Sequence, residues 1–151
     1  MYLIFLSLHN ILRWVVLIAG LIAVARALMG WLGRREWTRA DRLSGLLFGI
    51  SIDIQLLLGL ILYFFLSPWT QAVLRGNLGQ AMQNSETRFF AIDHILVMFL
   101  AVVSVHFGTA LARRAPEAVT KHRRAAIWFG LTLILILAGI PWWRPLLPLF
   151  G

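Results

Sequence analysis

The sequence contains no cysteine and few charged residues. None of its 151 residues is Cys, and only six are Asp or Glu. The absence of cysteine excludes disulfide bonds, thiolate-held iron–sulfur clusters and the CxxCH motif that attaches a c-type haem. Charged residues make up 13% of the chain and hydrophobic residues 60%, with a mean hydropathy of +0.82. That balance leaves too little polar surface for a soluble domain, so we expect a polytopic membrane protein.

The formal net charge of +8 does not indicate a nucleic-acid partner. The Lys and Arg residues lie in short segments between apolar runs, and no basic stripe with interleaved aromatic residues follows one soluble face. Basic residues in such loops report membrane topology and attract anionic lipid. The partner expected from the charge is therefore the lipid bilayer, with no nucleic acid.

Four apolar segments predict four membrane-spanning helices, at about 3–31, 39–66, 88–112 and 117–147. The first has no charged n-region and no A-x-A site, so we expect a retained helix rather than a cleaved signal. There is no convincing internal repeat, which argues against an inverted-repeat transporter. The expected fold is all-α: one transmembrane domain over 1–151, folded as a polytopic four-helix bundle.

Local signals mark the ends of these helices. Thr38 and Asp41 have the spacing of a capping box, which starts the second span near 39. Pro68 is placed for the first position of a short interfacial helix, and Pro116 for the first position of the fourth helix. Pro141 is expected to end or kink that fourth helix.

Basic residues are unevenly divided between the two ends of the predicted bundle. The first and third loops hold nine Lys or Arg, and the second loop with the C-terminal tail holds three. The positive-inside rule then places loops one and three in the cytoplasm and both termini on the outer side. The nine are Arg34, Arg35, Arg39, Arg42, Arg113, Arg114, Lys121, Arg123 and Arg124; the three are Arg75, Arg88 and Arg144.

Two histidines are predicted at one depth in the membrane. His9 and His94 each lie about six residues, or roughly 9 Å, from the outer end of their helices. Two such imidazoles on different helices suit a b-type haem, whose iron takes axial ligands on opposite sides of the porphyrin. Arg13 could pair with a haem propionate, and Met98, four residues after His94, could pack on the ring. The alternatives are another metal or ligand site, or a purely structural polar network.

Asp53 has three possible roles. It follows Gly45 and Gly49 at four-residue steps, on a narrow small-residue face that another helix can approach closely. It can be a proton-handling carboxylate, a third ligand beside His9 and His94, or the partner that neutralises Arg13. The cost of an isolated charge in the membrane favours the ion pair with Arg13.

The remaining polar residues at depth favour structural roles. His106 follows His94 by twelve residues, which rotates it by about 120° away from the same helix face. We interpret His106 as a structural histidine near the inner side, and His122 as a loop residue beside Lys121. Arg26 is expected to snorkel to the inner interface. Asp93 is expected to contact Arg88 or the second loop, or to orient an imidazole.

Four stretches carry a resemblance to a known family: LHNILRW (8–14), DIQLLLGL (53–60), RFFAIDH (88–94) and PW (141–142). They resemble small bacterial four-helix membrane proteins that carry a loose cytochrome b-like label, and the resemblance covers most of the chain. It implies a haem-ligand role for His9 and His94 and a location in the bacterial inner membrane. Similar proteins can carry His where this chain has Asp53, which gives weight to a His, Asp, His metal or proton site.

The first functional hypothesis is a membrane haem b protein that passes single electrons between quinol, or a redox partner subunit, and an acceptor at the outer face. The second is a cofactor-free accessory or scaffold subunit. The third is a small ion or metal transporter that uses His9, Asp53 and His94. No catalytic residue is predicted, because the largest loop has no nucleophile–base set, and whether the chain is an enzyme stays open. Whether the chain forms a homo-oligomer also stays open.

Overall fold

The computed structural model describes residues 1–76 and 78–144, and it confirms an all-α fold with four long apolar helices. The spans are α1 (Tyr2–Leu32), α2 (Arg39–Ile61) with its π-helical end η1 (Leu62–Leu66), α6 (His94–Arg113) preceded by the π-helical η2 (Phe89–Asp93), and α7 (Ala118–Gly139). Three short helices join the second span to the third: α3 (Pro68–Leu74), α4 (Leu78–Gln83) and α5 (Ser85–Arg88).

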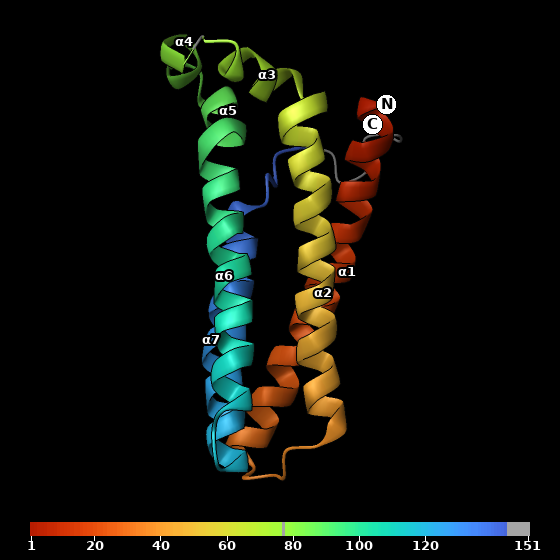
Figure 1. Ribbon diagram of the computed structural model, residues 1–151, viewed down its shortest axis with the longest axis vertical. Coiled ribbons are helices and arrows are strands. Elements are labelled where there is room, and N and C mark those ends of the chain that lie inside the picture. The colour runs from red at the N-terminus through yellow and green to blue at the C-terminus, as the bar shows by residue number, and fades with distance from the viewer. Residues whose placement is uncertain (77, 145–151) are drawn as a thin grey trace.

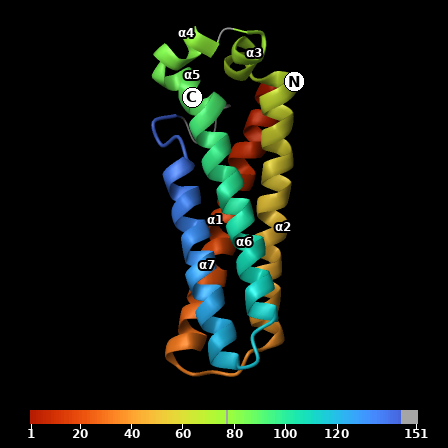
Figure 2. The ribbon, with the colours of Figure 1, turned by 60° about the vertical axis from the view of Figure 1, so that its left-hand side comes forward.

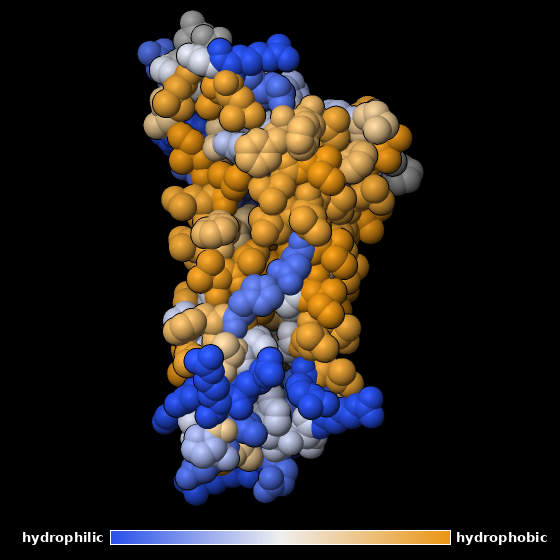
Figure 3. All heavy atoms as spheres, viewed as in Figure 1, coloured by the Kyte–Doolittle hydropathy of each residue, from blue (hydrophilic) through white to orange (hydrophobic). Residues whose placement is uncertain are grey.

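The four spans run up and down in one bundle (Figures 1 and 2). The N-terminus lies at the end that carries α3, α4 and α5, which we call the α3 end. The α1–α2 and α6–α7 connections lie at the opposite end, which we call the arginine-rich end. Figure 3 shows a broad hydrophobic band on the surface between these two more polar ends, as expected of a multi-pass membrane protein.

The helix boundaries follow the predicted signals at three places. Thr38 caps α2 with a complete capping box, in which its backbone N–H donates to Asp41 Oδ2 over 2.9 Å. Pro68 occupies the first turn of α3. Before Pro141, helix α7 ends at Gly139 and Ile140 is extended, the conformation that a following proline favours.

The prediction that Pro116 occupies the first position of the fourth helix was wrong. Helix α7 begins at Ala118 with Glu117 as N-cap, so Pro116 lies before the helix. The reason is that the turn closing α6 extends to Ala115, whose N–H donates to the Ala112 carbonyl over 3.2 Å. The predicted end at 147 falls outside the described residues, and the described helix stops at Gly139.

Small residues allow the helices to pack closely at the centre of the bundle. Phe48 and Phe129 are almost fully buried and meet edge to face, with ring centres 5.9 Å apart. Gly45 is buried against this pair, because a Cβ there would lie 2.9 Å from Phe129 Cζ. Gly45, on the small-residue face of α2, therefore leaves room for the Phe129 ring. On the other side of the core, Gly108 of α6 lies directly against Trp128 of α7.

Replacing Gly108 with alanine should destabilise the bundle. The added methyl would collide with Trp128 Cβ, which cannot move without the α7 backbone. Overpacking of this kind costs about 1–3 kcal/mol, so the thermal midpoint in detergent should fall. The matched control is Gly130→Ala on α7, where a Cβ meets nothing within 4 Å. That control should leave the midpoint unchanged or raise it, since alanine favours helix by about 1 kcal/mol; equal midpoints for both variants would contradict this packing.

Candidate cofactor site

A cavity of about 210 Å³ lies between α1, α2, α6 and the end of α7, and it reaches the α3 end. A single water needs only about 10–15 Å³ of such space, so the cavity has room for an organic ligand. Most of its lining is apolar, and a few polar side chains converge in it, as is typical of cofactor sites. The polar members are His9, Asn10, Arg13, Gln55, Tyr63, Ser67, Thr70, His94 and Arg144.

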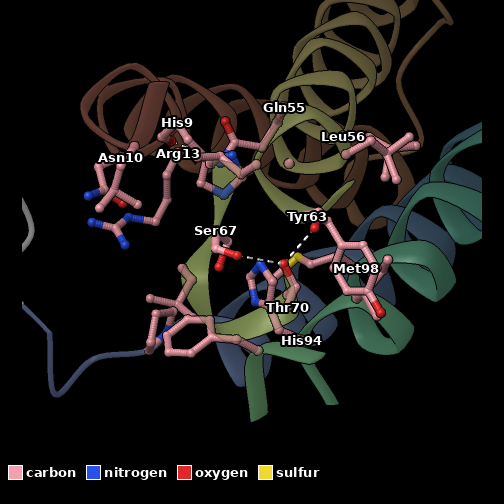
Figure 4. A pocket seen from close by; sticks show the side chains of 18 of the residues that line it. His9, Asn10, Arg13, Gln55, Leu56, Tyr63, Ser67, Thr70, His94 and Met98 are labelled. Atoms are coloured by element: carbon pink, nitrogen blue, oxygen red, sulfur yellow. Dashed lines mark hydrogen bonds between the residues drawn. The ribbon is translucent and has the colours of Figure 1, made fainter. Parts of the chain in front are cut away.

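His9 and His94 face each other in this cavity from α1 and α6 (Figure 4). Their ring centres are 6.3 Å apart and their planes are inclined by 65°. Two imidazole nitrogens bound to opposite sides of one metal ion lie about 4 Å apart, with ring centres about 6 Å apart, because each metal–nitrogen bond is about 2 Å long. The observed separation of the rings is therefore compatible with a shared axial metal.

The orientation of His94 is fixed by the end of α7. Its Nδ1 lies 2.7 Å from the carbonyl oxygen of Gly139, the last residue of that helix. A carbonyl only accepts hydrogen bonds, so Nδ1 carries the proton and donates it. Nε2 of His94 is then the nitrogen left with a lone pair, which is the tautomer that metal-ligating histidines adopt.

His9 is held by α2. Gln55 Nε2 donates to the backbone carbonyl of His9 over 2.9 Å, and the ring lies against Gly59, where a Cβ would be 3.3 Å from His9 Cε1. Within the described residues, His9 Nδ1 and Gln55 Oε1 are buried and have no hydrogen-bond partner. Buried polar atoms of this kind call for a ligand or water in the cavity.

Arg13 brings a positive charge to the same cavity. It lies one turn after His9 and is only 7% exposed. Met98 also lines the cavity, with its terminal methyl against Gly139, so both residues lie where the sequence predicted them relative to the histidines. A guanidinium in a largely apolar cavity favours a ligand with an anionic group.

The two π-helical turns form the wall of the cavity at the α3 end. A π-turn leaves carbonyl groups without their usual helical donors, and such turns are common at functional sites. Here side chains supply the donors: Tyr63 O–H donates to the Ala91 carbonyl over 2.9 Å, Thr70 Oγ1 donates to the Tyr63 carbonyl, and Gln71 donates to the Phe64 carbonyl. These bonds join η1, η2 and α3, and no sequence pattern predicted them.

Arg144 closes the same end of the cavity. Its Nε donates to Glu86 Oε1 over 3.0 Å, and its guanidinium lies over the rings of Phe90 and Trp69, at 4.4 and 5.3 Å from their centres. The interaction joins the segment after α7 to α3, α5 and η2. No sequence pattern predicted these partners of Arg144.

The structure places Asp53 elsewhere, which corrects both the predicted ion pair with Arg13 and the His, Asp, His cluster. Asp53 does not line the cavity; its Oδ1 is 2.8 Å from Nε2 of His106, on the α2–α6 face. The physical reason is helix rotation. Gln55 of α2 reaches His9, and Asp53, two residues earlier, is turned by about 200° around the helix axis.

The prediction for His122 was also wrong. His122 is not a loop residue: it lies in α7, is 1% exposed, and its Nε2 is 3.3 Å from the Glu36 carbonyl. Its ring fills the space left by Gly30, where any Cβ would collide with it. At the same end, Arg26 Nη2 lies 2.8 Å from Asp41 Oδ1, in the first turn of α2.

Asp93 contacts Arg88 as one alternative predicted, with Arg88 Nε 3.6 Å from Asp93 Oδ2. Over the residues that the structure describes, no three or more His, Cys, Asp or Glu side chains come together in a way that could hold a metal ion.

Comparisons with known proteins find no match. No protein-family model, no curated protein and no solved structure matches the chain. The side chains that line the cavity are therefore the basis for assigning its chemistry.

Removing the Tyr63 hydroxyl should loosen the α3 end of the cavity. Tyr63→Phe leaves the Ala91 carbonyl of η2 without its donor, which should cost about 1–3 kcal/mol and lower the thermal midpoint in detergent. The control is Tyr2→Phe, since Tyr2 also lines the cavity but its hydroxyl makes no hydrogen bond to any described residue. A similar midpoint for the two variants would show that the Tyr63 bond does not hold this wall.

Proposed function

We propose that the chain is a membrane b-type haem protein that transfers single electrons, with the haem held between His9 and His94. The observation that supports this proposal is the pair of imidazoles facing each other in one cavity, with ring centres 6.3 Å apart. They come from α1 and α6, which places one ligand on each side of the site. When bound, haem supplies reversible one-electron transfer.

Each polar residue of the cavity has a part in this proposal. His9 and His94 hold the iron, and the Gly139 carbonyl keeps His94 in the ligating tautomer and increases its basicity. Arg13 pairs with a propionate and balances its charge. Apolar side chains such as Leu56, Val102 and Ile136 exclude water from the site, and Met98 packs beside them.

The position of the cavity limits the partners. It lies toward the α3 end, which the positive-inside rule assigns to the outer face of a bacterial inner membrane. The electron donor in this proposal is quinol from the lipid phase or a partner subunit, and the acceptor lies at the outer face. The transporter hypothesis loses its support, because Asp53 lies outside the histidine cavity.

The absorption spectrum of the purified protein tests this proposal. After expression with ample haem, we expect a Soret band, sharp α and β bands on reduction with dithionite, and about one haem per chain by pyridine haemochrome assay, since one pair of axial histidines binds one iron. His9→Ala and His94→Ala should each abolish or strongly reduce these bands while the helical circular dichroism remains.

His106→Ala is the matched control. Like His94→Ala, it removes an imidazole from α6, but His106 lies outside the cavity. The haem absorption bands of this variant should therefore remain. A colourless wild-type protein would overturn the haem proposal. In that case His9→Ala and His94→Ala should mainly lower the thermal midpoint, the behaviour of a cofactor-free scaffold subunit.

Arg13→Gln should lower the midpoint potential of the haem. A nearby cation stabilises the reduced form, whose net charge is more negative, and the potential changes by about 59 mV for each tenfold change in a one-electron equilibrium. We expect a decrease of tens of millivolts in a potentiometric titration. Arg26→Gln changes the same charge on α1 outside this cavity and should have little effect; equal potentials in the two variants would place Arg13 away from the haem.

A further inference from the structure

The Asp53–His106 pair lies on a face of the bundle that is exposed to lipid. The side chain of Asp53 is 44% exposed and that of His106 52% exposed. Asp53 is close to the middle of its span, which runs from Arg39 to Leu66. Figure 3 shows hydrophilic side chains reaching into the hydrophobic band on this side of the molecule.

The helix neighbours of the pair are apolar and equally exposed. Ile50 and Leu57, three residues before and four after Asp53, are 45% and 60% exposed. Phe99 and Val103, seven and three residues before His106, are 55% and 48% exposed. Residues at these spacings share a helix face, so one carboxylate and one imidazole interrupt two otherwise hydrophobic stripes.

The pair has hydrogen-bonding capacity left over. Asp53 uses Oδ1 and His106 uses Nε2 for their mutual bond, so Asp53 Oδ2 and His106 Nδ1 remain for another molecule. Hydrocarbon cannot satisfy them, and ionisable side chains facing lipid are rare for that reason. Gly49, one turn before Asp53, is buried beside the imidazole, and a Cβ there would be 3.9 Å from His106 Cε1.

The ligand that fits must enter from the bilayer and carry polar groups into its apolar interior. Phospholipid headgroups stay at the interface, but a quinol combines an apolar ring with hydroxyl groups and dissolves in the hydrocarbon. One hydroxyl can donate to Asp53 Oδ2 and another can bond to His106 Nδ1, with the ring against Phe99 and Val103. We propose that Asp53 and His106 form a binding site, open to the lipid phase, for the head group of a membrane quinol.

At this site the chain would bind the quinol that donates electrons in the proposed function. The choice of a redox-active ligand rests on that function. The pair is separate from the histidine cavity. His106 follows His94 by twelve residues, or about 18 Å along α6, toward the arginine-rich end. Quinol binding and haem binding can therefore be lost independently.

The test is saturable binding of decylubiquinol to the full chain in detergent, measured anaerobically by quenching of tryptophan fluorescence. Asp53→Asn replaces the carboxylate acceptor with an amide and His106→Phe removes the imidazole acceptor, so each should weaken binding by about tenfold or more. Asp93→Asn makes the same change at an Asp outside this face, paired with Arg88, and should bind like the wild type. His9→Ala should also bind like the wild type.

Several outcomes would overturn the site. Two of them concern binding: no saturable binding by the wild type, or equal affinity of the wild type and both pair variants. The third is a fall in particle mass by light scattering when Asp53 is replaced, because the pair would then be a contact between two copies of the chain. Asp53→Asn is nearly isosteric, so it carries the test if His106→Phe does not fold. A colourless protein that binds the quinol contradicts only the haem proposal, and a coloured protein that does not bind it contradicts only this site.

Discussion

The hydrogen bond from His94 to the Gly139 carbonyl is the interaction on which the cavity depends. It exists because α7 stops at Gly139, two residues before Pro141, and leaves its last carbonyl without a helical donor. In a membrane that carbonyl needs a partner from the protein. The imidazole supplies it, and in doing so His94 is fixed in one tautomer with its other nitrogen available to a ligand. One helix end therefore sets both the shape and the chemistry of the site.

The same requirement for partners explains the other polar residues at depth. Arg26 is neutralised by Asp41, which also completes the cap of α2. His122 bonds to the Glu36 carbonyl and fills the space over Gly30. These contacts line a second pocket, at the arginine-rich end of the bundle. At the α3 end two imidazoles face each other across the cavity, and this pair is why that cavity is the candidate site.

Hydropathy and helix rise were enough to predict the four spans and the common level of His9 and His94. Depth follows from counting residues, and an error of one residue moves a side chain by only about 1.5 Å. Direction around the axis is harder, because the same error rotates the side chain by about 100°. That is why Asp53 was assigned to the cavity, when α2 presents Gln55 there.

Other parts of the site depend on contacts between segments far apart in the sequence. The bond between Tyr63 and the Ala91 carbonyl joins two π-turns whose positions no local pattern marks. The burial of His122 depends on the absence of a side chain at Gly30, more than ninety positions earlier. A sequence shows neither fact, because each follows from which helices become neighbours.

The chain order of the cavity has a consequence for its biogenesis. His9 is made first, His94 much later, and the Gly139 carbonyl only with the last helix. Ribosomes deliver a membrane protein from its N-terminus, so three helices can be in the bilayer before His94 has its partner. The cavity is therefore completed only when the fourth helix has been translated, and a chain truncated before Gly139 lacks the acceptor that orients His94.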